Sequence, residues 1–286
     1  PNANYEDSIK RFTKTQKIPD GTFKPDLDHM TIFVRTCLRE DRNIDARPRI
    51  TGESMSDTAF ACLRSLVASS NFAQDKLSLK IVVLDDHSDA HFLDEIKTIF
   101  AVSKVETEIR SLNLKGQGTS LHYQFEQARD TENGLCSFVE DDYLHEEDAS
   151  FRLWEFYKGT AEASQSHLVL YPQEHPYLYR DLYPALIMTG ADRHWRTIRH
   201  ATHTLLTHSD VLKEHWDNFE NTKYVGIRKK RRKGSEAQTT NKLFQKIPGF
   251  SPMQPLACHL QFEETMPPLY NWHGLWERHF KTKEAA

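Results

Sequence analysis

The stretch Leu135-Cys136-Ser137-Phe138-Val139-Glu140-Asp141-Asp142-Tyr143-Leu144 decides how the chain is interpreted. Its apolar first half predicts a buried strand, and the strand ends abruptly in three acidic residues. Ligands of α/β folds bind at the carboxyl ends of strands, so acids in this position indicate a binding site. Because adjacent carboxylates repel one another, a divalent cation with oxygen ligands would relieve the crowding. The alternative interpretation is a solvated acidic turn before the next helix.

A second predicted strand ends in the same way. The run from Leu79 to Leu84 is apolar apart from Lys80, and Asp85 and Asp86 follow it directly. The alternative for this acidic pair is a helix cap, since Asp is common where a strand leads into a helix. Two acidic strand ends in one chain are a more specific signal than either one alone.

Strand and helix patterns alternate regularly as far as Asp148. We expect strands at 30–34, 79–84, 105–112 and 135–139. Helices are expected between them, the first capped by Ser54 and the second by Ser88 or Asp89. This alternation predicts an α/β fold with a mainly parallel sheet and helices on both faces.

The second half of the chain is less regular. Strand candidates are 167–170, 185–188 and 203–206, helix candidates are 210–219, 237–247 and 269–283, and 248–256 is loop-like. The breakers in 1–28 indicate an N-terminal arm. We expect one domain over 29–286, divided into a regular half (29–148) and an elaborated half (149–286).

Composition narrows the class of protein. The 286 residues have 38% hydrophobic and 27% charged side chains, as in ordinary globular proteins, and a net charge of -4. We therefore expect no nucleic-acid partner. The basic run 228–233 predicts a solvated loop that could close over a ligand or attract an anionic membrane. No apolar run could span a bilayer and no secretory signal is visible, so we expect a cytoplasmic protein with four reduced cysteines.

The order of these features resembles a glycosyltransferase of the GT-A fold, closest to the family 2 type. Three runs carry the resemblance: Val34-Arg35-Thr36-Cys37-Leu38-Arg39, Val82-Val83-Leu84-Asp85-Asp86-His87-Ser88 and Phe138-Val139-Glu140-Asp141-Asp142. They are similar to the family's opening strand, to its Val-Val-Asp-Asp-Gly-Ser-like run and to its Asp-x-Asp run. The resemblance implies a Rossmann-like GT-A sheet with an acceptor-binding second half. It also implies transfer of a sugar from a nucleotide-diphosphate sugar to a carbohydrate or other hydroxyl acceptor.

The resemblance also implies roles for single residues. Thr36 and Arg39 would line the nucleotide pocket, and Asp85 or Asp86 would recognise the base or ribose. Glu140 and Asp142, with Asp141, would hold Mn²⁺ or Mg²⁺ against the diphosphate. The donor expected is UDP-linked, although Cys37 stands where the family often has an aromatic residue.

Two further features fit a donor site. Lys115-Gly116-Gln117-Gly118 precedes a predicted helix, and glycines at a helix N-terminus with a nearby lysine form a natural anion site. The alternative is an ordinary turn with a helix cap. Many GT-A enzymes complete their metal site with a late histidine after a proline-containing stretch, and His259 is the counterpart here. The competing interpretation is a buried structural histidine.

An inverting transferase needs a base for the acceptor hydroxyl. The family usually has a Glu-Asp pair before a late helix, and here Glu236 is followed by Ala237. Asp192 is the rival candidate. His194, His200, His203 and His208 do not have the spacing of a zinc helix, so we expect them to line the acceptor cleft, with Trp195 against a sugar ring.

Two other functions stay open. A nucleotidyltransferase uses a similar sheet and metal, but its glycine-rich loop after the first strand is missing from 35–47. A non-catalytic carbohydrate- or protein-binding module with a degenerate site is the other, and Ala237 is its best argument.

Overall fold

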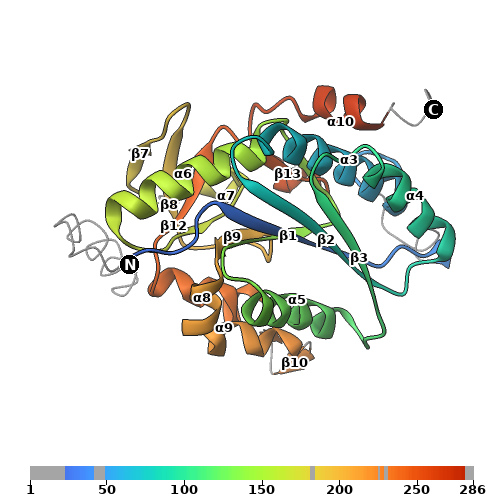
Figure 1. Ribbon diagram of the computed structural model, residues 1–286, viewed down its shortest axis with the longest axis horizontal. Coiled ribbons are helices and arrows are strands. Elements are labelled where there is room, and N and C mark those ends of the chain that lie inside the picture. Colours follow the sequence, from blue (N-terminus) through green and yellow to red (C-terminus); the bar gives the residue numbers. More distant parts are fainter. Residues whose placement is uncertain (1–22, 42–48, 181–183, 225, 229–230, 281–286) are drawn as a thin grey trace.

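A computed structural model describes residues 23–41, 49–180, 184–224, 226–228 and 231–280 (Figure 1). Most of the predicted arm, 1–28, therefore lies outside the described residues. Part of the basic run 228–233 lies outside them as well, and its described part forms a hairpin of β10 (Gly226–Arg228) and β11 (Arg231–Lys233) where a loop was predicted.

The regular first half matches the prediction. Its elements are β1 (His29–Thr36), α3 (Met55–Ala73), β2 (Ser78–Asp86), α4 (Ala90–Phe100), β3 (Glu106–Leu112), α5 (Gln117–Thr131) and β4 (Leu135–Glu140). Strands β3, β2, β1 and β4 lie side by side in that order and pair in parallel. Ser54 caps α3 as expected, since its hydroxyl accepts the backbone N–H of Asp57 at 3.0 Å.

The second half extends this sheet with β6 (Val169–Leu170), β7 (Ile187–Thr189), β8 (His194–Ile198), β9 (Leu205–His208) and β12 (Gly249–Met253). Its strand β13 (Ala257–His259) instead pairs with β5 (Tyr143–His145), which follows β4, in a separate two-stranded sheet. Its helices are α6 (Ala149–Ser164), α7 (Tyr177–Arg180), α8 (Ser209–Glu214), α9 (Trp216–Glu220) and α10 (Trp272–Phe280). Short 3-10 helices are η1 (Asn221–Lys223), η2 (Glu236–Gln238), η3 (Thr240–Gln245) and η4 (Glu263–Thr265).

Within the described residues the main sheet has nine strands in the order β3-β2-β1-β4-β9-β6-β12-β8-β7. Strand β9 is antiparallel to both of its neighbours, β4 and β6, so the regular parallel half joins a mixed half. Helices α3, α4 and α6 cover one face and α5, α8 and α9 the other (Figure 1). The predicted α/β fold class is confirmed.

Two predictions for the second half were wrong. The segment 248–256 contains strand β12 in the interior of the sheet, where a loop was expected. Gly249 and Pro252 concealed it, since both are rare inside central strands. The segment 237–247 forms 3-10 turns instead of an α-helix.

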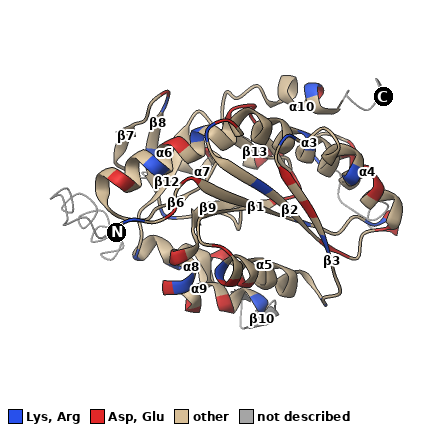
Figure 2. Cartoon of the chain, in the orientation of Figure 1, with Lys and Arg blue, Asp and Glu red and all other residues tan. Residues whose placement is uncertain are grey.

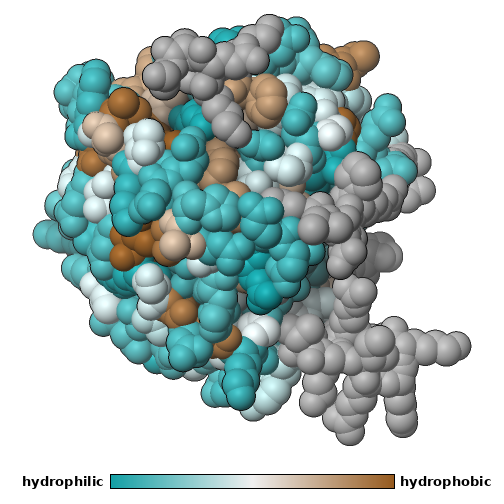
Figure 3. Space-filling view, turned by 90° about the vertical axis from the view of Figure 1, so that its right-hand side faces the viewer, coloured by the Kyte–Doolittle hydropathy of each residue, from teal (hydrophilic) through white to brown (hydrophobic). Residues whose placement is uncertain are grey.

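None of the described helices is both long and apolar enough to cross a bilayer. Acidic and basic residues are interspersed over the helices (Figure 2). The face in Figure 3 is mostly hydrophilic, with isolated hydrophobic patches.

Candidate functional site

The ends of three parallel strands meet at one edge of the sheet. Thr36 of β1 lies opposite Asp85 of β2, and Arg35 lies opposite Glu140 of β4. The same register therefore places both acidic strand ends at the same end of the sheet, on either side of β1. This edge is where α/β sheets bind ligands.

Asp85 and Asp86 both hold neighbouring segments in place. Asp85 is buried, and it accepts the Thr36 hydroxyl at 2.9 Å and the Ser88 backbone N–H at 3.2 Å. Asp86 accepts the backbone N–H of Leu114 at 2.9 Å and pairs with His87 at 2.8 Å. Asp86 thereby fixes the loop that leads to α5.

The two predicted basic residues flank this edge. Lys115 is exposed on the loop held by Asp86, directly before Gly116, the N-cap of α5 with φ 89°. Arg39 forms two hydrogen bonds with the carboxylate of Asp41, at 2.9 and 2.6 Å. Arg39 is therefore engaged locally, while Lys115 faces solvent.

Asp142 and His259, far apart in the sequence, are in contact. Strands β5 and β13 pair antiparallel, with Tyr143 opposite His259, and their two rings stack with centroids 4.6 Å apart. This pairing places the Nε2 atom of His259 3.1 Å from one oxygen of Asp142. Arg49 approaches the other oxygen at 2.9 Å. Asp142 thus lies between two cationic groups.

Glu140 faces a different cation. Its carboxylate lies 3.5 Å from the Nη2 atom of Arg35, and its backbone N–H donates to the hydroxyl of Thr204 at 3.2 Å. Among the described residues, the ligand atoms of Glu140, Asp142 and His259 do not converge as a group of three within 4.8 Å. The side chains therefore have to rearrange before they can share one ion.

The three acids have different proton affinities. Burial raises the pKa of Glu140 against the pull of Arg35, and burial together with the charge of Asp142 raises the pKa of Asp141 to about 7. Burial would also raise the pKa of Asp142, but His259 and Arg49 outweigh it and lower that pKa. Burial opposes the charged form of His259, yet Asp142 and Glu140 raise its pKa.

These shifts predict a pH-dependent stability. Since the folded-state pKa of Asp141 lies above its ordinary value of 3.8, the folded chain holds a proton there that the unfolded chain releases. The contribution of Asp141 to the free energy of unfolding therefore falls as pH rises from about 4 to 7. Asp141→Asn removes this decrease, because the amide does not titrate. We expect Asp141→Asn to gain on the order of 2–4 kcal/mol over wild type at pH 8, and much less at pH 5.

Urea unfolding of both proteins at pH 5 and pH 8 measures this gain. The exposed Asp75 provides the matched control, since Asp75→Asn should leave stability unchanged at both pH values. An equal gain for Asp141→Asn at both pH values would contradict the charge assignment.

The two base candidates have different surroundings. The carboxylate of Glu236 is 43% exposed and lies 3.5 Å from the Nδ1 atom of the buried His203. Its charge also contributes to the raised pKa of Glu140, which places it near the acidic cluster. Asp192 instead contacts Arg193 at 2.8 Å and Arg152 at 3.3 Å.

Two cavities border these residues. One of about 10 Å³ lies between the strand ends of Thr36 and Glu140 and helix α3, room for about one water. The other, of about 230 Å³, is lined by Arg199, Asn241 and Lys242 together with Phe244 and Ala237, the residue after Glu236. Of these two cavities, only the second has room for more than about one water.

The expectation for Trp195 was wrong. Its side chain is 1% exposed and stacks on Phe156 with ring centroids 4.0 Å apart. It is a core residue and does not face a sugar site.

His203, beside Glu236, is neutral. Its burial, and to a smaller extent the charge of Arg35, lowers the pKa of His203 to about 3.

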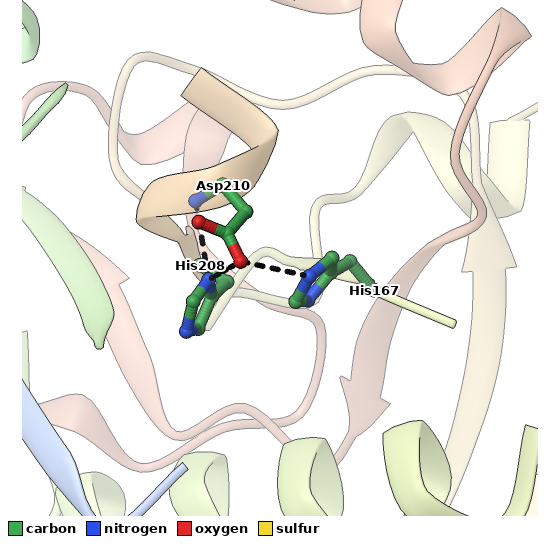
Figure 4. A group of neighbouring side chains, drawn as sticks. All are labelled: His167, His208 and Asp210. Carbon is green, nitrogen blue, oxygen red and sulfur yellow. Dashed lines mark hydrogen bonds and ion pairs between the residues drawn. The ribbon is translucent and has the colours of Figure 1, made fainter. Parts of the chain in front are cut away.

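His208 does not lie with the other histidines of its predicted cluster. It meets His167 and Asp210, and the ligand atoms of these three side chains all lie within 4.8 Å of one another (Figure 4). Within the described residues this is the one group of three His, Cys, Asp or Glu side chains so arranged, and it could hold a metal ion. Sequence spacing missed it because its members come from separate elements.

Comparisons with known proteins give similarity of fold only. No family model matches the sequence, and no curated protein matches it. Among solved structures, the chain is similar to Staphylococcus aureus TarS 1–349, with 13% identity, a TM-score of 0.49 and coverage of 80% of this chain and 59% of that one. A structure of TarS 1–349 in complex with UDP gives 13% identity, a TM-score of 0.44 and coverage of 78% and 60%.

A UDP-glucose pyrophosphorylase solved with UDP-glucose is similar as well, with 9% identity, a TM-score of 0.46 and coverage of 90% of this chain and 98% of that one. The UTP-bound enzyme of Acinetobacter baumannii gives 8% identity, a TM-score of 0.45 and coverage of 90% and 93%. The match therefore spans less than two thirds of TarS 1–349 and nearly all of the pyrophosphorylases.

Proposed function

We propose that the chain is a metal-dependent glycosyltransferase, which moves a sugar from a UDP-linked donor to a hydroxyl acceptor. The observation that carries the proposal is the meeting of Asp142 with His259 beside Glu140 and Asp141, at the carboxyl ends of parallel strands. A buried Thr36–Asp85 pair lies next to this cluster, at the end of β2.

The donor end of the proposed site consists of Thr36, Arg39, Asp85, Asp86 and Lys115. Asp86 anchors the backbone of Leu114 and so positions the loop that presents Lys115 at the start of α5. Backbone N–H groups at a helix start and a lysine are suited to phosphate oxygens. In this proposal the carboxylates of Asp85 and Asp86 would orient the base and ribose of the donor.

The residues at the acidic cluster fit a hard divalent cation. Glu140, Asp141 and Asp142 offer carboxylate oxygens and His259 an imidazole nitrogen, which is a donor set suited to Mn²⁺ or Mg²⁺. When bound, such an ion supplies charge that stabilises the departing diphosphate. Arg49, now 2.9 Å from Asp142, would be available to pair with a phosphate oxygen of the donor if such an ion took over its contact with Asp142.

Glu236 is the base we favour. Its carboxylate is 43% exposed, the next residue, Ala237, lines the cavity that could hold the acceptor, and its charge contributes to the raised pKa of Glu140. The Nδ1 atom of the neutral His203 lies 3.5 Å from one oxygen of Glu236. A neutral ring brings no full positive charge to this carboxylate, which could otherwise hinder Glu236 in taking a proton. The carboxylate of Asp192 is already paired with two arginines, which makes it the weaker candidate.

Turnover of nucleotide sugars tests the proposal. We expect Mn²⁺-dependent release of UDP from one UDP-sugar of a panel, whether to water or to an added sugar alcohol. A parallel reaction holds UTP with sugar 1-phosphates and measures pyrophosphate. Pyrophosphate release without UDP release would instead support a nucleotidyltransferase. Binding of donor with no product in either assay would favour the non-catalytic module.

A further inference from the structure

The group of His167, His208 and Asp210 lies at the end of the sheet opposite the acidic cluster. His208 ends β9 and pairs with Leu135, the first residue of β4, while Glu140 ends the same strand. Leu135 and Glu140 are five residues apart on an extended strand, so the group and the acidic cluster are roughly 17 Å apart along β4. This group therefore cannot contribute to the proposed donor site, and whatever it does is independent of glycosyl transfer.

The three side chains point their polar atoms at one place (Figure 4). One oxygen of Asp210, Oδ2, lies 3.3 Å from Nδ1 of His208 and 3.8 Å from Nε2 of His167. Two ligands of a tetrahedral ion, each about 2.0–2.1 Å from it, lie ~3.3–3.4 Å apart. The observed spacings are close to the edges of such a tetrahedron. The Nζ atom of Lys213 pairs with the other oxygen of Asp210, Oδ1, at 3.4 Å, whereas the two histidines face Oδ2.

Contacts behind His208 fix its tautomer. Its Nε2 atom lies 3.2 Å from the backbone carbonyl of Asp26, and a carbonyl oxygen can only accept, so Nε2 carries the hydrogen. The Nδ1 atom then holds a lone pair, which accepts the backbone N–H of Asp210 at 3.1 Å. The Oδ2 atom of Asp210 lies 3.3 Å from the same nitrogen, so two electron-rich atoms lie close together beside one backbone N–H.

His167 is also oriented by a hydrogen bond at the ring nitrogen that does not face Asp210. Its Nδ1 atom lies 3.2 Å from the hydroxyl of Tyr157, and that hydroxyl accepts the backbone N–H of Leu168 at 3.3 Å. The ring stacks on His208 with centroids 4.6 Å apart, and Phe23 packs at 5.0 Å. Histidines that bind metals are oriented by such hydrogen bonds on the distal nitrogen.

We propose that His167, His208 and Asp210 bind one zinc-like divalent cation that stabilises the fold. Two imidazole nitrogens and one carboxylate oxygen suit zinc better than magnesium or calcium, and water would complete a tetrahedron. The ion would cancel the opposition of Nδ1 and Oδ2, in exchange for the Asp210 N–H contact. It would join the segment before β6 to β9 and α8, and His208 would connect it to the segment at Asp26 that leads to β1.

Metal binding to EDTA-stripped protein tests the site. We expect one Zn²⁺ per chain to survive gel filtration, and the melting temperature to rise by about 5 °C at a hundredfold excess over Kd. Co²⁺ should give the intense visible bands of a four-coordinate site. His167→Gln and Asp210→Asn should each remove most of the rise.

Two further variants locate the effect. Asp217→Asn, on the neighbouring α9 with its side chain 74% exposed, is the control and should keep the full rise. Asp142→Asn shows how much of the rise comes from zinc held at the acidic cluster instead. Equal melting temperatures in EDTA show that the variants are folded. If His167→Gln is not folded, the result for Asp210→Asn, whose side chain is 48% exposed, decides the test. A rise that both ligand variants retain means adventitious zinc only and overturns the proposal. No rise in the wild type, or loss only in Asp142→Asn, overturns it too.

Discussion

Asp142→Asn is expected to weaken Mn²⁺-dependent binding of UDP by more than about a hundredfold. Changing even a residue that merely orients a metal ligand costs ten- to a hundredfold, and Asp142 is proposed as a ligand itself. It is also the best placed of the three acids to carry charge at neutral pH. His259 and Arg49 hold its pKa down, whereas burial raises the pKa of both Glu140 and Asp141.

Titration of Mn²⁺ by electron paramagnetic resonance, with and without UDP, measures this loss. Asp148→Asn is a matched control, since Asp148 lies a few residues further along and pairs with Arg152 at 2.9 Å, outside the acidic cluster. The control should bind Mn²⁺ and UDP as the wild type does. Affinities of Asp142→Asn within twofold of wild type would remove this residue from the metal site.

Glu236→Gln is expected to lower the rate of UDP release by about 10²–10⁴-fold, the usual contribution of a general base. The amide keeps the size and the His203 contact of the side chain but cannot take a proton from the acceptor hydroxyl or from water. Donor affinity should stay unchanged, because Glu236 is proposed to act on the acceptor and not on the donor. The decrease should therefore fall on kcat and leave KM for the donor nearly constant.

The rival residue supplies the control for this prediction. Asp192→Asn should retain activity within about twofold, since Asp192 already pairs with Arg152 and Arg193. Turnover of one UDP-sugar by the three proteins at saturating Mn²⁺ gives the comparison. If Asp192→Asn were inactive while Glu236→Gln stayed active, the base would have to be reassigned.

The regular half of the fold could be predicted from sequence because its signals are local. The apolar runs that end at Asp85 and Glu140 became β2 and β4, and in-register pairing with β1 placed their ends together. Strand β12 was missed because Gly249 and Pro252 contradict its local pattern. Its position depends instead on pairing with β6 and β8.

The candidate site was only partly visible in the sequence. Its strand-end acids follow from local pattern, but the contacts of Asp142 with Arg49 and His259 join segments that no periodicity connects. Arg49 lies between the first predicted strand and the predicted helix capped by Ser54, with no signal of its own. The family resemblance, and not spacing, pointed to His259. His167 was read only as part of a strand candidate, so its meeting with His208 and Asp210 could not be foreseen.

Thermal unfolding with UDP, GDP, ADP and CDP, each with and without Mn²⁺, tests the central claim most directly. A ligand that binds only the folded chain stabilises it by about 2.7 kcal/mol at a hundred times its Kd. The account predicts a large rise in melting temperature with UDP and Mn²⁺ together, and its loss in Asp142→Asn. No rise with any nucleotide, with or without Mn²⁺, would contradict the donor site at the acidic strand ends.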